Sequence, residues 1–128
     1  NMQYPSHNSI DKALIFIVHG SRREASADEF EQMLKQLNPQ SAHPCFTAYM
    51  ELQSPTLQER ISDLADQGFS EIDIIPLFIL EGKHIAKDIP LQVQHCHQEF
   101  PDLAINLKPH LSQQNSFLQA LIQISKEQ

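Results

Sequence analysis

The sequence predicts an α/β fold, a three-layer sandwich around a four-stranded parallel sheet, on two observations. Short apolar segments alternate with segments of helical periodicity, as in right-handed β–α–β crossovers. The first apolar segment, residues 13–18, reads ALIFIV without a polar residue, which is typical of a strand buried on both faces. A chain of 128 residues suits one core, so we expect a single domain over 1–128, with the polar residues 1–10 as a flexible segment.

Further strands are expected at 46–50, 72–80 and 103–107, where apolar and β-branched residues gather. Pro76 removes one donor from the ladder, but the apolar content of 72–80 still favours a strand. With right-handed crossovers, the strand order is expected to be 2-1-3-4, with helices on both faces of the sheet.

The helices are expected to begin at capping residues. Ser26 and Glu29 have the spacing of a capping box, and the helix that they start is expected to end before Pro39. Ser54-Pro55 supplies an N-cap and a first-turn proline for a second helix, which ends at Gly68.

Two more helices follow from apolar periodicity. After the loop 81–84, Asp88 is the expected cap of a helix whose inward residues are Ile89, Val93, Phe100 and either Cys96 or His97. A last helix contains Phe117, Leu118, Leu121 and Ile122.

Composition excludes several classes of function. A net charge of −7 argues against nucleic acid, which requires clustered Lys and Arg. No apolar run approaches the roughly 18 to 20 residues of a membrane span, and the first nine residues lack a signal-peptide core, so we expect a cytoplasmic protein that binds no membrane. Cys45 and Cys96, the only cysteines, are expected to be buried thiols rather than a disulfide.

Common catalytic motifs are also absent. With three glycines in the chain there is no dinucleotide-binding G-x-G-x-x-G, no P-loop and no G-x-S-x-G elbow. Neither C-x-x-C nor H-E-x-x-H occurs, so the chemistry must come from another arrangement.

The carboxyl ends of the strands are the expected ligand site, because ligands of open parallel sheets bind where crossovers change face. His19 follows the first strand, Glu51 follows the second, and His84 lies in the loop after the third. In the order 2-1-3-4 the first and third strands are neighbours, so His19 and His84 are expected to face a common cleft. Two imidazoles and a carboxylate suit Co²⁺, Fe²⁺, Ni²⁺ or Zn²⁺.

Four basic residues, Arg22, Arg23, Lys83 and Lys87, lie on the same loops of an otherwise acidic protein. Focused positive charge attracts carboxylates or phosphates, so an anionic ligand is expected. Isolated surface charges are common, so a merely solvated role for the two arginines stays open.

Structural explanations compete for the remaining candidates. A single histidine at a strand end is more often structural, and only the joint placement of His19 and His84 favours function. Glu51 either assists in metal or proton transfer, or it only caps or orients the next helix. His95 and His97 point to nearly opposite sides of a helix and cannot chelate one ion together. His110 follows the fourth strand at the same sheet end and could reach the cleft, but an exposed loop position is expected.

Three segments carry a family resemblance: VHGSR at 18–22, ELQSPTL at 51–57 and PLFILEGKHIAKDIP at 76–90. They resemble the short sirohydrochlorin chelatases, the CbiX family, in order and spacing. The resemblance implies a chelatase-like fold and insertion of a divalent metal (cobalt, or iron or nickel) into sirohydrochlorin for cobalamin or sirohaem. It also implies that His19 and His84 deliver metal and accept pyrrole protons, that two copies form a homodimer, and that the metal is substrate with no prosthetic group.

This activity agrees with the residues. Metallation replaces two pyrrole N–H protons by a divalent ion, and imidazole, with an ordinary pKa of about 6.5, both accepts protons and binds such ions. Sirohydrochlorin carries carboxylates that Arg22, Arg23, Lys83 and Lys87 could bind as charge-assisted pairs. Glu81, where relatives often carry a small residue, and the glycine-free segment 108–115 depart from the family pattern.

Two other functions fit the same residues less well. A module that carries metal or tetrapyrrole without catalysis would use the same two histidines. A hydrolase or phosphotransfer enzyme would need a nucleophile motif, and none is evident.

Overall fold

The computed structural model describes residues 11–20, 24–80 and 82–128, and residues 1–10 lie outside it. The sheet consists of β1 (Lys12–Val18), β2 (Cys45–Tyr49), β3 (Glu71–Pro76) and β4 (Ala104–Leu107). Their order is β2-β1-β3-β4, and every neighbouring pair is parallel. The predicted fold class and strand order are confirmed.

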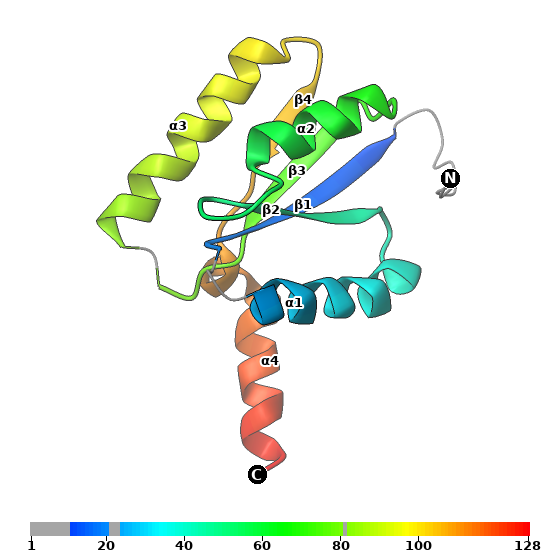
Figure 1. The fold of residues 1–128 in the computed structure, drawn as a ribbon. Coiled ribbons are helices and arrows are strands. Elements are labelled where there is room, and N and C mark those ends of the chain that lie inside the picture. The colour runs from blue at the N-terminus through cyan, green and yellow to red at the C-terminus, as the bar shows by residue number, and fades with distance from the viewer. Residues whose placement is uncertain (1–10, 21–23, 81) are drawn as a thin grey trace.

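The described chain has four α-helices (Figure 1): α1 (Glu24–Leu37), α2 (Leu57–Asp66), α3 (Lys83–Glu99) and α4 (Asn115–Lys126). Short 3-10 helices, η1 (Asn38–Gln40) and η2 (Leu111–Gln113), follow α1 and precede α4. Helix α1 lies on one face, α2 and α3 lie on the other, and α4 projects away from the body. Within the described part, no helix is long and apolar enough to cross a membrane.

The hydrophobic core lies between the sheet and helices α2 and α3. Ala13, Ile15 and Ile17 of β1 and Ile72 and Ile74 of β3 have no exposed surface and pack there. The residues that alternate with them in β1 are half-buried. The prediction of a strand buried on both faces is therefore only half right, because α1 packs chiefly along β2 on the other face.

Several predicted element boundaries were wrong. Helix α1 begins at Glu24, so Ser26 lies inside it rather than capping it. Strand β3 ends at Pro76 instead of residue 80, because proline lacks the N–H that would continue the ladder. Helix α3 begins at Lys83, where Ala86 N–H donates to the carbonyl of Gly82, so Asp88 lies inside this helix.

Helix α2 is capped two residues later than predicted. Thr56 is its N-cap, and its Oγ1 accepts a hydrogen bond from Glu59 N at 3.2 Å. The Glu59 carboxylate accepts one from Thr56 N at 2.8 Å, which completes a capping box. The carbonyl of Pro55 accepts a hydrogen bond from Tyr49 N, and this bond keeps residues 54–55 outside the helix. Gly68 follows the helix end with φ +98°, as expected.

An ion cluster lies on the α1 face near the amino ends of β1 and β3. Lys12 Nζ is 2.7 Å from Asp73 Oδ2, and Asn106 Nδ2 donates to Asp73 Oδ1 at 2.9 Å. Burial alone would raise the pKa of Asp73, but the hydrogen bonds from Lys12 and Asn106 and the charges of Lys12 and Lys108 lower it overall. The same hydrogen bond raises the pKa of Lys12 against the opposing effect of its burial.

Candidate functional site

His19 and Glu51 form an exposed pair at the carboxyl edge of the sheet. The strands remain bonded past their ends, because Met50 N donates to Val18 O at 2.9 Å and Glu51 N donates to His19 O at 3.2 Å. His19 Nε2 lies 3.2 Å from Glu51 Oε1, and both side chains are about half exposed, at 47% and 50%. The structure thus brings together two of the residues that the sequence proposed for the site.

Gly20 allows these two loops to approach each other. Its φ is +103°, and a Cβ at this position would lie 2.0 Å from the carbonyl oxygen of Glu51. Only glycine fits such an approach without displacing the backbone. Leu52, directly after Glu51, also has a positive φ of +71°, which is uncommon for a residue with a side chain. Backbone strain of this kind often accompanies functional sites.

The segment that carries His84 starts beside the end of β1. Ile17 and Pro76 are register partners, and Leu77 N donates to Ile17 O at 2.9 Å. The chain then reaches α3, and His84 lies in its first turn. The side chain of His84 lies outside the part that the structure describes, so the common cleft with His19 stays a prediction.

The four predicted basic residues fall into two groups. Lys83 and Lys87 are exposed in the first turns of α3, at the carboxyl edge. Arg22 and Arg23 lie outside the described residues.

The geometry of the His19–Glu51 pair suits a divalent metal. Imidazole nitrogen and carboxylate oxygen bind such ions at about 2.0 to 2.2 Å, so two ligands of one ion stand roughly 3 Å apart. The observed 3.2 Å fits this separation as well as it fits a hydrogen bond. Among the side chains that are described, no three His, Cys, Asp or Glu residues gather to hold an ion. The pair therefore offers two ligands and leaves positions open.

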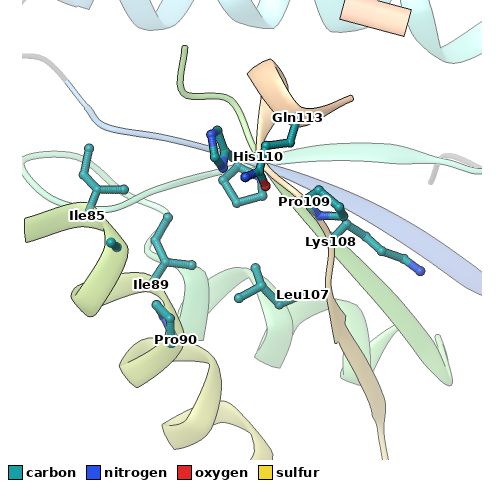
Figure 2. Close-up of a pocket in the computed structure, with 10 residues that line it drawn as sticks. Ile85, Ile89, Pro90, Leu107, Lys108, Pro109, His110 and Gln113 are labelled. Carbon is teal, nitrogen blue, oxygen red and sulfur yellow. The ribbon is translucent and has the colours of Figure 1, made fainter. Parts of the chain in front are cut away.

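A pocket of about 310 Å³ lies next to this edge, between α3 and the segment after β4 (Figure 2). Ile85 and Ile89 of α3 form one wall, and Leu107, Pro109 and His110 form the other. His110 is half-buried there, so the expectation of an exposed loop position was wrong. Hydrophobic walls with a few polar groups are typical of small-molecule sites.

Exposed apolar side chains also lie on the loops of this edge. Leu52 follows β2 and is 58% exposed, while Ile79 and Leu80 follow β3 and are 60% and 85% exposed. Their exposure was not predicted from the sequence, because the apolar content of 77–80 favoured a strand and Leu52 belongs to no site pattern. The sequence feature that could have identified Ile79 and Leu80 is the apolar run that continues past Pro76.

The other candidates are buried thiols and exposed histidines. Cys96 is buried, and burial, with a smaller effect from Glu99, raises the pKa of its thiol to about 11. His95 and His97 beside it are exposed on α3, so Cys96 and not His97 takes the inward position that the sequence left open. Cys45 is also a buried free thiol, and burial raises its pKa despite a hydrogen bond with Ser41.

Comparison with known proteins decides the family. The family model of CbiX matches residues 13–128, nearly the whole described chain. The chain belongs to the CbiX family.

Two relatives show the range of the match. The CbiX-family chain is 31% identical over 97 residues to sirohydrochlorin ferrochelatase of Priestia megaterium, covering 73% of this chain and 35% of that protein. It is 30% identical over 79 residues to sirohydrochlorin cobaltochelatase of Methanopyrus kandleri, and this match covers 61% of this chain and 55% of that protein. The chain thus spans only about a third to a half of these relatives' length.

Solved structures share the fold. A CbiX protein assigned to cobalamin biosynthesis, from Marinobacter aquaeolei, has a TM-score of 0.78 at 26% identity, covering 91% of this chain and 95% of that one. Sirohydrochlorin chelatase SirB of Bacillus subtilis, in complex with cobalt, has a TM-score of 0.75 at 24% identity, and this chain covers 51% of it. The fold therefore occurs both at this length and as half of a longer chain.

Proposed function

We propose that this protein inserts a divalent metal, Co²⁺ or alternatively Fe²⁺ or Ni²⁺, into sirohydrochlorin. The observation that carries the proposal is the His19–Glu51 pair, 3.2 Å apart and exposed at the carboxyl edge beside the segment of His84, in a chain of the CbiX family. Relatives named sirohydrochlorin ferrochelatase and cobaltochelatase support the substrate.

The proposed reaction exchanges one metal ion for two protons. His19 and Glu51 bind the incoming ion through one nitrogen and one oxygen, a set weak enough to release it to four pyrrole nitrogens. His84 and His19 accept the two N–H protons that the macrocycle loses, since imidazole takes up protons near neutral pH. The balance is one M²⁺ bound and two H⁺ released.

The proposed substrate site joins charge and apolar surface. Arg22, Arg23, Lys83 and Lys87 pair with the carboxylates of the macrocycle. The exposed Leu52, Ile79 and Leu80 offer apolar contact to its ring face, and the pocket beside His110 accepts a substituent at its edge.

Anaerobic incubation with sirohydrochlorin and Co²⁺ tests the proposal, with insertion followed by absorbance. His19→Ala and His84→Ala should each slow turnover at least about 100-fold, since an acid–base group is worth 10² to 10⁴. His95→Ala, which changes an exposed histidine farther along α3, is the matched control and should keep wild-type turnover.

Two results would contradict the proposal. Near-normal turnover in both variants would remove the histidines from the site. Binding of metal or tetrapyrrole without turnover by the wild type would instead make the chain a carrier.

We also propose that two copies pair as a homodimer. The support is length, because this chain covers about half of SirB, and two copies would supply the amount of structure that SirB holds in one chain.

A further inference from the structure

The pocket between α3 and the segment after β4 combines apolar walls with a polar end. Figure 2 shows Ile89 and Leu107 on opposite walls, with His110 and Gln113 close together at one end. Gln113 N donates to His110 O at 2.9 Å, so the turn of η2 holds these two residues beside each other. The pocket therefore suits a group with an apolar stem and a polar tip.

The polar end suits an anion. Among the described residues that line the pocket none is acidic, although the chain has a net charge of −7. His110 is half-buried and offers an imidazole N–H, and the amide of Gln113 adds two donors. Lys108 also lines the pocket, but Figure 2 shows its side chain pointing away, and its Nζ lies 3.9 Å from Asp73 Oδ2. His110 and Gln113 are therefore the groups that would bind an anion here.

The volume of the pocket suits one substituent of a tetrapyrrole rather than the whole ring. Drug-sized ligands occupy pockets of about 300 to 1,000 Å³, and this pocket, at about 310 Å³, is at the lower limit. A tetrapyrrole is larger than such ligands and cannot be enclosed. A side chain of two or three carbons that ends in a carboxylate fits, and sirohydrochlorin carries its carboxylates on such side chains.

The pocket lies within reach of a macrocycle at the His19–Glu51 pair. Ile85, on one wall, directly follows His84 in the sequence. Strand β4 is two strands away from β1, so the carboxyl ends of these strands are about 10 Å apart. Bonds of about 1.5 Å, added outward from the centre of the macrocycle, put such a carboxylate about 8 to 9 Å from a central metal. The two spans agree.

We propose that this pocket is a specificity subsite for one carboxylate-bearing side chain of the tetrapyrrole. His110 and Gln113 donate hydrogen bonds to the carboxylate, while Ile85, Ile89 and Leu107 contact the methylene groups. The inference rests on the proposed function and adds a residue that selects the substrate by its acidic side chains. His110 acts in binding alone, whereas metal and protons are handled at the other end of β1.

Binding of sirohydrochlorin in the absence of metal, followed by its fluorescence, tests the subsite. Gln and Glu have the same size and differ in charge, so His110→Gln and His110→Glu form a matched pair. His110→Gln keeps an N–H donor, and its dissociation constant should stay within about 3-fold of the wild type. His110→Glu opposes one carboxylate with another and should raise the dissociation constant at least about 30-fold.

Two controls locate the effect. His97→Glu adds the same charge to an exposed position in the last turn of α3 and should bind sirohydrochlorin as the wild type does. His110→Glu should also bind Co²⁺ as the wild type does, because the proposed metal ligands lie at the ends of β1 and β2. Gln113→Glu, at an exposed position, repeats the test should His110→Glu not fold.

The comparison of the two His110 variants decides the subsite. Equal weakening by Gln and Glu would mean that His110 only shapes the loop, and unchanged binding in both would remove the pocket from the substrate site; each result overturns the inference. A wild type that does not bind sirohydrochlorin overturns the subsite and the proposed function together. A wild type that binds sirohydrochlorin without inserting metal contradicts the proposed function, whereas the His110 variants still support or overturn the subsite.

Discussion

Lys12 and Asp73 pair near the amino ends of β1 and β3, whereas His19 and Glu51 pair at the carboxyl ends of β1 and β2. The Asp73 side chain is 7% exposed and also accepts from Asn106, while the side chains of His19 and Glu51 are about half exposed. In the first pair the carboxylate is largely shielded from solvent and accepts a bond at each oxygen. In the second pair both side chains are accessible to solvent.

This difference separates structural from chemical roles. Removing one partner of a buried pair costs several kcal/mol, because the other charge stays buried without compensation. An exposed pair contributes about 0 to 1 kcal/mol. Fold stability therefore gives no reason for His19 and Glu51 to lie together, whereas exchange of a ligand requires that they be accessible.

The largest expected effect comes from changing Gly20. Gly20→Ala places a Cβ against the carbonyl of Glu51 and adds a left-handed φ, so it should cost about 2 to 4 kcal/mol of unfolding free energy and most of the activity. Urea unfolding measures the first effect and the insertion assay measures the second.

Gly68→Ala is the matched control for this change. Gly68 also has a positive φ, but a Cβ there meets nothing within 4 Å, so the cost should be only about 1 kcal/mol with full activity. Equal effects of the two substitutions would show that the Gly20–Glu51 approach has no special role.

Asp73→Asn should give the opposite result to His19→Ala. It leaves Lys12 and Lys108 without the buried carboxylate and should lower the unfolding free energy by about 2 kcal/mol, while turnover per folded molecule stays near wild type. His19→Ala should lose turnover at unchanged stability. A large loss of specific activity in Asp73→Asn would refute this division of roles.

The Lys12–Asp73 pair should also set the pH dependence of stability. Because the pKa of Asp73 is lowered in the folded state, its contribution is present above the ordinary value of 3.8 and is lost as pH falls through the folded pKa. Because the pKa of Lys12 is raised, its contribution is present below 10.5 and is lost as pH rises above that value. Unfolding free energies measured at both extremes should show these losses in the wild type.

In Asp73→Asn, the losses of unfolding free energy at low pH and at high pH should both become smaller. If the variant lost as much unfolding free energy at low pH as the wild type, the acid-sensitive group would lie elsewhere.

Glu51→Gln should have the smallest effect. It keeps an oxygen near His19 but removes the charge, so metal affinity should fall about 10-fold, with stability within about 0.5 kcal/mol of the wild type. Calorimetric titration with Co²⁺ measures the affinity. Unchanged affinity would mean that Glu51 only orients the loop.

The parallel sheet with helices on both faces was predictable, because it follows from local patterns and a general rule of handedness. Alternating apolar and periodic segments fix three crossovers, and the rule for open sheets then selects the residues after each strand. His19 and Glu51 are within reach of that argument, since both directly follow a strand.

Features that depend on contacts distant in sequence were not predictable. The approach of Gly20 to Glu51 and the Lys12–Asp73 pair depend on exact register, which the residue pattern does not contain. The pocket beside His110 arises from the path of 108–114 past α3. The periodicity of α4 predicts a helix with an apolar stripe, but it is the same whether the covering surface belongs to this chain or to another.

A Co²⁺ titration in the absence of tetrapyrrole measures whether the exposed pair at the carboxyl edge receives the metal. We expect saturable binding to the wild type and to Asp73→Asn, with binding at least about 10-fold weaker in His19→Ala. Equal affinity of His19→Ala and the wild type would contradict it.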